Sequence, residues 1–195
     1  MTTPGRRPGD SGTRAAILDA AKEAFGASGY AATSVRGVAR TAGVDPSLVL
    51  HFFGSKDGLF EAALELPMDP AVLVQALLAS PHDALGETIV RTFLGVWDAT
   101  PGQGPMLAML RGAVSHEDSA DKLRELLLRL ILRPLAIGAA AGDPDRRAAL
   151  LASQVTGLAL VRYVLRVEPV ASAPADELAS LLGPTLQRYL TGPLP

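Results

Sequence analysis

The chain has 195 residues, of which 48% are hydrophobic and only 5% aromatic, and it contains no cysteine. A chain of this length buries enough surface to hold a core without disulfides, and the lack of cysteine excludes thiol nucleophiles and thiolate metal sites. The formal net charge of −2 argues neither for nor against nucleic-acid binding. Alanine and leucine, both strong helix formers, dominate. Because no alternating pattern is sustained, the sequence predicts an all-α fold.

The N-terminal residues 1–12 carry two arginines with no apolar segment behind them, which is not typical of a signal peptide. We expect them to form a flexible arm. The most apolar regions further along are interrupted by Arg129, Arg133 and Arg162, and neither supplies the roughly 18 uncharged apolar residues of a membrane span. The sequence therefore predicts a soluble, cytoplasmic protein without a membrane-spanning segment.

The first predicted helix begins at Thr13, an N-cap candidate, and ends at Gly29. Apolar residues recur along it at helical spacing. Residues 30–32 then link it to a second, short helix that Thr33 or Ser34 caps. Each of these hydroxyl side chains can accept a hydrogen bond from a free backbone N–H group, so the sequence leaves the choice between them open.

Gly43 ends the second helix, and a third begins just after it. Asp45 is the N-cap candidate of the third helix, and Pro46 takes the first helical position, where the missing N–H group of proline costs nothing. The proline therefore starts this helix and does not break it. Gly54 ends it within about two turns, and Ser55 caps a fourth helix that continues until the next proline.

Six positions in the second and third helices have the spacing of a helix-turn-helix. Counted from Val35 as position one, they are Val38 at four, Ala39 at five, Gly43 at nine, Val44 at ten, Val49 at fifteen and Phe52 at eighteen. A small residue at five lets the second helix cross closely, and glycine at nine permits a left-handed turn. The other four must be apolar to seal the wedge between the helices. An ordinary helical hairpin is the alternative, but agreement at all six positions favours a helix-turn-helix at about residues 34–53.

In a helix-turn-helix the N-terminal residues of the second helix face base edges in the major groove. Ser47 can donate or accept a hydrogen bond there, whereas Pro46 and Leu50 can contact only thymine methyl groups or sugar carbons. His51, Arg36, Lys56 and the capping hydroxyls suit phosphates. The residues predicted to contact DNA are Thr33, Ser34, Arg36, Asp45, Pro46, Ser47, Leu50, His51 and Lys56. The alternatives are a loose core contact for Leu50 and an ordinary surface histidine for His51.

Beyond residue 66 the pattern changes to longer helices. They are predicted at residues 70–79, 82–99, 105–114, 118–138, 145–167 and 176–190. Pro134 is expected to kink the fourth of these near Leu130, and the pair Gly183–Pro184 to bend the last. We find no internal repeat and no low-complexity tract beyond the N-terminal arm.

A stripe of large apolar residues in this second region is a candidate lining for a ligand pocket, with Arg111 and His116 as polar contacts. Methionine and aromatic residues at helical spacing are more often plain core. The candidate set is Phe93, Trp97, Met106, Met109, Leu110, Arg111 and His116. His116 does not begin a zinc-protease motif, because Ala120 stands where the second histidine is required. We predict no catalytic, metal or cofactor site.

The stretch TSVRGVARTAGVDPSLVLHFFGSKDGLFEAAL, residues 33–64, resembles the DNA-binding domain of the TetR family of transcriptional regulators, and the Phe-Gly-Ser-Lys step is particularly specific. The resemblance implies an N-terminal DNA-binding domain over 13–66 and a helical ligand-binding and dimerisation domain over 67–195. It also implies a homodimer that pairs its last two helices, 145–167 and 176–190. The remainder is similar to an actinobacterial-type branch of the family. Leu50 departs from the tyrosine or histidine common at that position, so a polar backbone anchor is missing.

The expected function is a sequence-specific DNA-binding transcriptional regulator, a repressor released from a near-palindromic operator by a small apolar or amphipathic ligand. The alternative is a ligand-independent architectural or protein-interaction module, which a filled C-terminal core would favour. An enzyme is disfavoured, because three dispersed histidines without cysteine assemble no nucleophile–base pair or metal site.

Overall fold

The structure is a computed structural model that describes residues 9–63, 69–99, 107, 110, 117–139 and 142–194. These residues form helices and turns but no strand, which confirms the predicted all-α fold. The chain divides into two compact units, residues 1–65 with 104–120 and residues 66–103 with 121–195. None of the described helices has both the length and the apolar character that crossing a bilayer requires. Of the helix predicted at 105–114, all but residues 107 and 110 lie outside the described residues.

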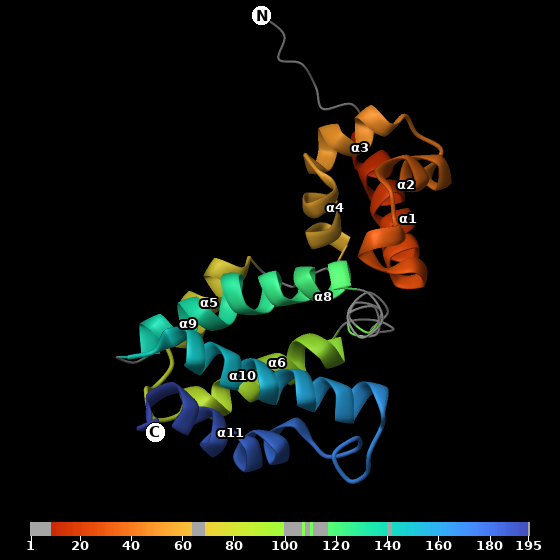
Figure 1. Ribbon diagram of the computed structural model, residues 1–195. Helices are drawn as coiled ribbons and strands as arrows, with labels where there is room; N and C mark the ends of the chain where they lie inside the picture. The colour runs from red at the N-terminus through yellow and green to blue at the C-terminus, as the bar shows by residue number, and fades with distance from the viewer. Residues whose placement is uncertain are drawn as a thin grey trace, which may run out of the picture. The chain divides into compact units, whose positions relative to one another are not determined.

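Within residues 9–63 the helices are α1 (Gly9–Ala32), α2 (Val35–Ala42), α3 (Pro46–Phe53) and α4 (Lys56–Ala63), shown in red to orange in Figure 1. The predicted start of the first helix at Thr13 is wrong, because α1 begins at Gly9 and takes in the last residues of the predicted arm. Gly29 does leave the helical conformation, with φ 74° and ψ 177°. Residues 30–32 were predicted as a link, but they return to helical structure after this break.

An aromatic cluster joins α4 to α1. The Phe60 ring meets the rings of Phe25 and Tyr30 edge-on, with centroids 4.9 and 5.1 Å apart. Tyr30 also donates its hydroxyl proton to Asp57 in the first turn of α4. Such aromatic pairs stabilise a fold by about 1 kcal/mol each beyond the area they bury. The break in α1 at Gly29 thus precedes the residue that holds α4 in place.

The later helices are α5 (Pro70–Leu78), α6 (Leu85–Ala99), α8 (Glu117–Arg124), η1 (Glu125–Leu132), α9 (Arg133–Ala139), α10 (Pro144–Ala159), η2 (Leu160–Val164) and α11 (Ala175–Thr191). η1 and η2 are π-helical. The kink predicted near Leu130 is therefore replaced by the wider turns of η1, in which the Arg133 N–H group donates to the Leu128 oxygen five residues back. Proline lacks an N–H group and clashes with an α-helical turn, so these wider turns precede Pro134.

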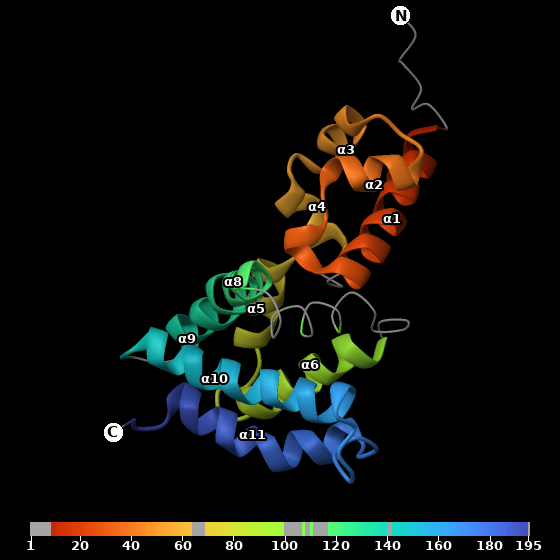
Figure 2. The same cartoon turned by 45° about the vertical axis from the view of Figure 1, so that its right-hand side comes forward.

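In the second unit α11 packs against both α6 and α10, and Figures 1 and 2 both show α10 and α11 running side by side. The crossing of α6 and α11 is close enough to require glycine. A Cβ atom added to Gly86 would lie 2.2 Å from the Gly183 oxygen and 2.6 Å from the Gln187 nitrogen, both backbone atoms. α11 continues through Pro184. The two glycines therefore let the helix backbones touch.

The side chain of Gln187 completes this crossing by capping the start of α6. Its Oε1 atom accepts from the Gly86 N–H group at 2.8 Å, and its Nε2 atom donates to the His82 oxygen at 2.8 Å. The first N–H groups of a helix have no partner within the helix itself. Gln187 supplies one from another helix, so α6 begins at Leu85 and not at His82 as predicted.

Arg147 fastens the chain's C-terminal end to the start of α10. Although only 6% exposed, its guanidinium donates to the Gly142 oxygen at 2.9 Å, the Tyr189 oxygen at 2.7 Å and the Gly192 oxygen at 3.0 Å. Tyr189 and Gly192 lie at the C-terminal end of α11, where free carbonyl groups attract a positive charge. One side chain thus satisfies carbonyl groups from two segments.

Replacing Arg147 by methionine keeps the apolar stem but leaves these three carbonyl groups without their donor. We expect the free energy of unfolding to fall by about 2 kcal/mol, measured by urea denaturation. The matched control is Arg146→Met, since Arg146 lies on the exposed side of the same turn with its guanidinium 3.4 Å from Asp143. An exposed change of this kind alters stability by at most about 0.5 kcal/mol. Equal losses of unfolding free energy in the two variants would contradict the role of Arg147 as the donor that links the C-terminal end of α11 to the start of α10.

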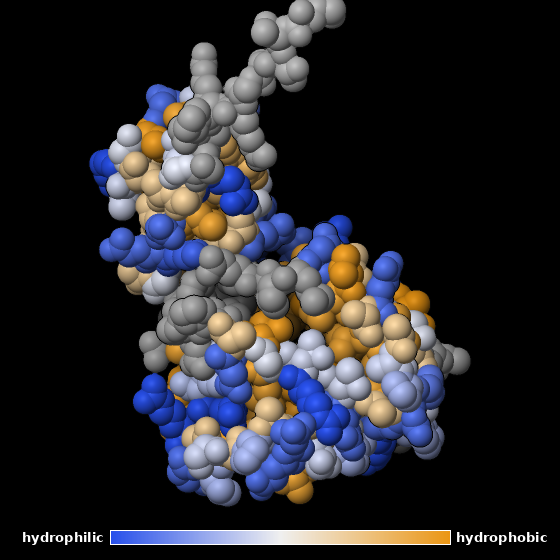
Figure 3. All heavy atoms as spheres, turned by 180° about the vertical axis from the view of Figure 1, so that it is seen from behind, coloured by the Kyte–Doolittle hydropathy of each residue, from blue (hydrophilic) through white to orange (hydrophobic). Residues whose placement is uncertain are grey.

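Several large apolar side chains remain exposed on the second unit, and seen from behind it shows apolar side chains gathered among polar ones (Figure 3). Among the described residues of the second unit, on whichever face they lie, the exposed large apolar side chains are those of Val72, Ile137, Leu160, Leu165, Val167 and Leu181. Leu181 on α11 is the most exposed of them at 66%. Single exposed leucines are common on protein surfaces, so Leu181 becomes informative only through the cavity beside it, described below.

Candidate nucleic-acid interface

The turn between α2 and α3 has the backbone that the spacing predicted. Gly43 adopts the left-handed conformation with φ 68° and ψ 30°, which costs a glycine little and other residues more. After it, the Val44 N–H group donates to the Ala39 oxygen at 2.9 Å and closes the end of α2. At the other end the Ser34 hydroxyl accepts from the Gly37 N–H group at 3.0 Å. Ser34 is therefore the cap of α2.

The predicted wedge between the two helices is formed as well. Val38, Ala39 and Val49 are at most 1% exposed, and Val44 and Phe52 are half-buried at its edge. Because Ala39 has only a methyl group, α3 can cross α2 directly above it. Together with Gly43, these residues confirm all six positions of the helix-turn-helix pattern.

Asp45 starts α3 by accepting two hydrogen bonds with one oxygen. Its Oδ1 atom accepts from the Ser47 backbone N–H group at 2.8 Å and from the Ser47 hydroxyl group at 2.5 Å. The hydroxyl bond first, and the backbone bond after it, lower the pKa of the Asp45 carboxyl group below its ordinary value. Pro46 occupies the first position of the helix. The predicted cap and start of α3 are confirmed.

The N-terminal part of α3 is exposed within the part of the chain that the structure describes. Ser47 and His51 are exposed, Leu50 is 47% exposed and Pro46 is half-buried. Leu48, which was not predicted to contact DNA, is also 38% exposed. A helix of this kind can place a hydroxyl group, an imidazole and aliphatic carbon against base edges and sugars. The core-contact alternative for Leu50 is disfavoured by this exposure.

The flanking residues are less uniform than predicted. Arg36 and Ser34 are exposed on α2. The phosphate contact predicted for Thr33 is wrong, because its side chain is 6% exposed and its hydroxyl group donates inward to the Gly29 oxygen at 2.8 Å. Lys56 is half-buried, and its ammonium group donates to the Ala31 oxygen at 3.3 Å. A phosphate reaching Lys56 would find an ammonium group already held in place.

The sequence reasoning missed Tyr30, which it treated as part of a link. The Tyr30 ring lies beneath the Lys56 ammonium group, 4.2 Å from its centroid, and packs on Phe60 as described above. A cation over an aromatic ring is attracted by the ring's negative face. The signal available in the sequence was an aromatic residue directly after a helix-breaking glycine. We interpret Tyr30 as a positioning residue for Lys56.

Comparison with known proteins decides the family. The model for bacterial regulatory proteins of the tetR family matches residues 17–63, and that for the tetracyclin repressor-like C-terminal domain matches residues 83–190. The chain belongs to the TetR family. It is therefore a DNA-binding transcriptional regulator, and the architectural-module alternative is not favoured. Regulators of the TetR family bind DNA operators and act as dimers with ligand-binding domains.

Individual relatives agree with this placement in the TetR family. The chain is 30% identical to the HTH-type transcriptional regulator BetI of Rhizobium meliloti over 169 residues, covering 81% of each chain. It is 29% identical to the regulatory protein RaaS of Mycobacterium tuberculosis, covering 95% of this chain and 89% of that one. A TetR-family regulator from Streptomyces coelicolor matches with a TM-score of 0.73 and 41% identity, covering 96% of this chain and 99% of that one.

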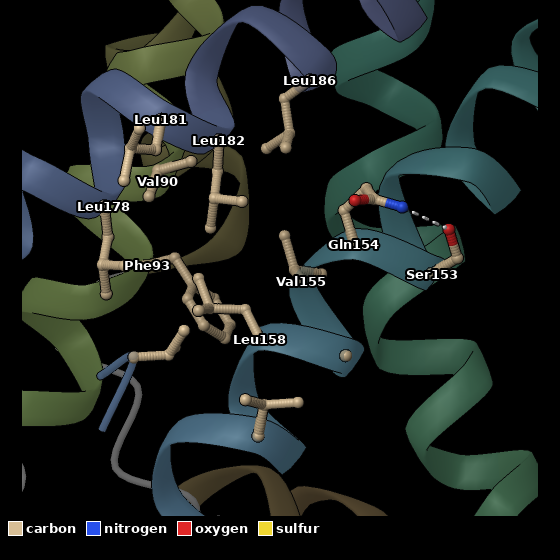
Figure 4. A pocket seen from close by; sticks show the side chains of 13 residues that line it. Val90, Phe93, Ser153, Gln154, Val155, Leu158, Leu178, Leu181, Leu182 and Leu186 are labelled. Atoms are coloured by element: carbon tan, nitrogen blue, oxygen red, sulfur yellow. Dashed lines mark hydrogen bonds between the residues drawn. The ribbon is translucent and has the colours of Figure 1, made fainter. Parts of the chain in front are cut away.

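The candidate ligand residues of this TetR-family chain do not form one site in the described residues. Phe93 lines an apolar cavity of about 400 Å³ between α6, α10 and α11 (Figure 4). Trp97 does not line it, because its ring lies flat on that of Tyr163 with centroids 4.8 Å apart. Leu110 is buried. Met106, Met109, Arg111 and His116 lie outside the described residues.

Polar contacts hold the Trp97 stack in place. Tyr163 donates its hydroxyl proton to Asp98 at 2.8 Å, and burial raises the pKa of Tyr163, so this group stays protonated. Arg162 lies 3.6 Å from the other Asp98 oxygen. Its guanidinium also donates to the oxygens of Val170 and Ala173, both at 2.8 Å. These contacts are typical of a structural core whose aromatic rings are held by hydrogen bonds and an ion pair.

A phosphate role for Arg36 has a distinct signature. Arg36→Ala should weaken binding by a similar factor on every DNA sequence and reduce the slope of log affinity against log salt by about one. Fluorescence anisotropy on a labelled duplex across a salt series measures both. Arg129→Ala on η1 removes the same charge from an exposed position in the second unit, outside α10 and α11, and should leave the slope unchanged. A loss confined to one base position would contradict the phosphate role.

Proposed function

We propose that this TetR-family chain is a repressor that binds a near-palindromic operator as a homodimer and is released from it by a small apolar or amphipathic ligand. The observation that carries the proposal is the exposed N-terminal part of α3, held outward by the crossing of α2 and α3. Each subunit would insert α3 into one major groove, with Ser47 and Leu50 toward base edges and Arg36 toward phosphates.

The dimer would form through α10 and α11. Their outer face carries the cavity of about 400 Å³, lined almost entirely by apolar side chains, and Leu181 beside it is 66% exposed. Figure 4 shows leucines of α11 and the side chains of Val155 and Leu158 on α10 converging on this space. An apolar, hollowed face with exposed leucine is typical of a surface that a second subunit covers.

The ligand would act on the same region. Phe93 of α6 lines the cavity, and a volume of about 400 Å³ falls within the range of small-molecule sites. A molecule bound there would lie directly beneath the face that we assign to the second subunit. A ligand shifts an equilibrium between two conformations only by its differential affinity for them. This ligand would therefore release DNA if it bound more tightly to the conformation of the dimer in which the two α3 helices no longer match successive major grooves.

Selection of bound DNA from a random pool tests this proposal most directly. We expect enrichment of two inverted half-sites whose centres lie about 34–36 Å apart or at a multiple of that distance. The Pro46→Asp, Leu50→Asp double variant keeps the helix start at Asp45 but places two carboxylates on the reading surface, and it should enrich nothing. Enrichment of isolated, unpaired half-sites would overturn the dimeric arrangement, and no enrichment by the native chain would overturn operator binding.

A further inference from the structure

Ser47 is the first residue within α3 that has a hydrogen-bonding side chain, and its hydroxyl proton is already donated to Asp45. A serine hydroxyl has one proton to donate and two lone pairs to accept with. The Ser47 hydroxyl donates to the Asp45 Oδ1 atom at 2.5 Å, while the same oxygen accepts from the Ser47 backbone N–H group at 2.8 Å. Ser47 therefore faces outward as an acceptor only.

The major groove contains two kinds of partner for such a group. Adenine N6 and cytosine N4 are amino groups that donate, whereas guanine O6 and N7 and thymine O4 accept. An acceptor-only hydroxyl can bond the amino bases. Opposite guanine or thymine it would bring two acceptors together with no proton between them, which leaves both without a partner once water is displaced.

We propose that Asp45 is a specificity-determining residue: by holding the proton of the Ser47 hydroxyl group, it restricts this position to amino bases, adenine or cytosine, on the strand that Ser47 contacts. This inference rests on the proposed reading role of α3. Asp45 itself touches no base in this arrangement and acts through Ser47. Its carboxylate also disfavours acceptor atoms of the bases nearby, because these atoms carry partial negative charge.

The same cap occurs a second time without the hydroxyl group. Asp69 precedes Pro70 at the start of α5, and its Oδ1 atom accepts from the Ala71 N–H group at 2.7 Å. The chain carries three Asp-Pro caps: Asp45 and Asp69 accept from the residue after the proline, which is serine in the first and alanine in the second, whereas Asp143 accepts from the Arg146 N–H group. Asp69→Gly is therefore a matched control for Asp45→Gly, since it removes an equivalent cap that holds no hydroxyl proton. Glycine at an N-cap costs only a few tenths of a kcal/mol relative to aspartate.

The test uses the full-length chain and the operator selected from the random pool. The base position read by Ser47 is the one whose preference disappears in Ser47→Ala. At that position we expect the native chain to prefer A and C over G and T on one strand by roughly fivefold to tenfold. Asp45→Gly should raise affinity for all sequences, because a negative charge is lost, and should reduce this preference to less than about twofold. Asp69→Gly should retain the native preference.

A single-atom change in the DNA provides a second readout. Where the selected base is adenine, replacement by purine removes only the 6-amino group, and where it is cytosine, replacement by 2-pyrimidinone removes only the 4-amino group. The native chain should lose roughly fivefold in affinity, and Ser47→Ala nothing. An unchanged preference in folded Asp45→Gly, or a split of A·T against G·C pairs, would overturn the inference while leaving operator binding intact. If the native chain selects no operator, the proposed function itself fails.

Discussion

Gly86→Ala should destabilise the second unit by about 3 kcal/mol, the upper end of the range for overpacking a close contact. The added methyl group would lie 2.2 Å from the Gly183 oxygen. A backbone oxygen cannot rotate away as a flexible side chain can, so α6 and α11 would have to separate. Their separation would also strain the bond from the Gly86 N–H group to Gln187. Urea unfolding followed by circular dichroism measures the loss.

The same helix supplies the control for this substitution. Gly95 also lies in α6, but a Cβ atom there would have no neighbour within 4 Å. Gly95→Ala removes a flexible residue from a helix and should stabilise the unit by up to about 1 kcal/mol. The two substitutions are chemically identical and differ only in what the methyl group meets. Equal unfolding midpoints for both variants would show that the α6–α11 crossing is looser than described.

Leu182→Asp should convert the protein to monomers and reduce affinity for the full operator by at least about 100-fold. Leu182 on α11 lines the apolar cavity that faces the proposed partner subunit. A carboxylate there would be buried without a counter-charge in the dimer but solvated in the monomer. Because two linked half-sites bind far more tightly than one, loss of the dimer removes this gain.

Light scattering gives the mass of the variant, and anisotropy with the selected operator gives its affinity. Leu181→Asp is a companion that carries little risk of unfolding, because Leu181 lines the same cavity and is already 66% exposed. Val72→Asp is the control, an apolar residue 54% exposed on α5 and away from that cavity. It should remain a dimer with native affinity. A folded dimer of both leucine variants would place the interface elsewhere.

The structure of the first unit could be predicted closely where it depends on residues near one another in the chain. The caps Ser34, Asp45 and Ser55 each accept from an N–H group two or three residues further on. Gly43 needs only its own backbone conformation. Short-range features of this kind leave clear patterns in residue type and spacing. Short-range features of this kind are almost sufficient to predict the helix-turn-helix, and with it the exposed N-terminal part of α3.

Thr33 marks the limit of this local reasoning. Thr33 and Ser34 are adjacent hydroxyl residues, and either suits a cap, so the sequence could not separate them. The choice depends on the break at Gly29, which brings the Gly29 oxygen within 2.8 Å of the Thr33 hydroxyl group. That bond turns Thr33 inward and leaves Ser34 to cap α2. The error in the predicted DNA contacts therefore has its origin four residues upstream.

In the second unit the deciding contacts join residues that are distant in sequence. Gln187 caps α6 from 101 residues away, and Arg147 reaches the Tyr189 oxygen across 42. No local pattern predicts such pairs. The prediction that one stripe of apolar residues lines a ligand pocket was wrong for Trp97 for the same reason. Phe93 and Trp97 share a helix face by spacing, but they pack against different neighbours. Phe93 lines the cavity, whereas Trp97 stacks on the ring of Tyr163. Tyr163 belongs to η2, which lies far from Trp97 in the sequence and close to it only in the folded chain.

That flat stack has a practical consequence, because Trp97 is the only tryptophan in the sequence. Intrinsic indole emission therefore follows the second unit alone, whereas far-ultraviolet ellipticity follows the helices of both. During heating, a difference between the two melting curves would show that the first unit, which contains the helix-turn-helix, unfolds at a different temperature from the second unit, which contains Trp97. Trp97 is thus an intrinsic fluorescence probe of the second unit, and no added dye is needed to determine which unit unfolds first.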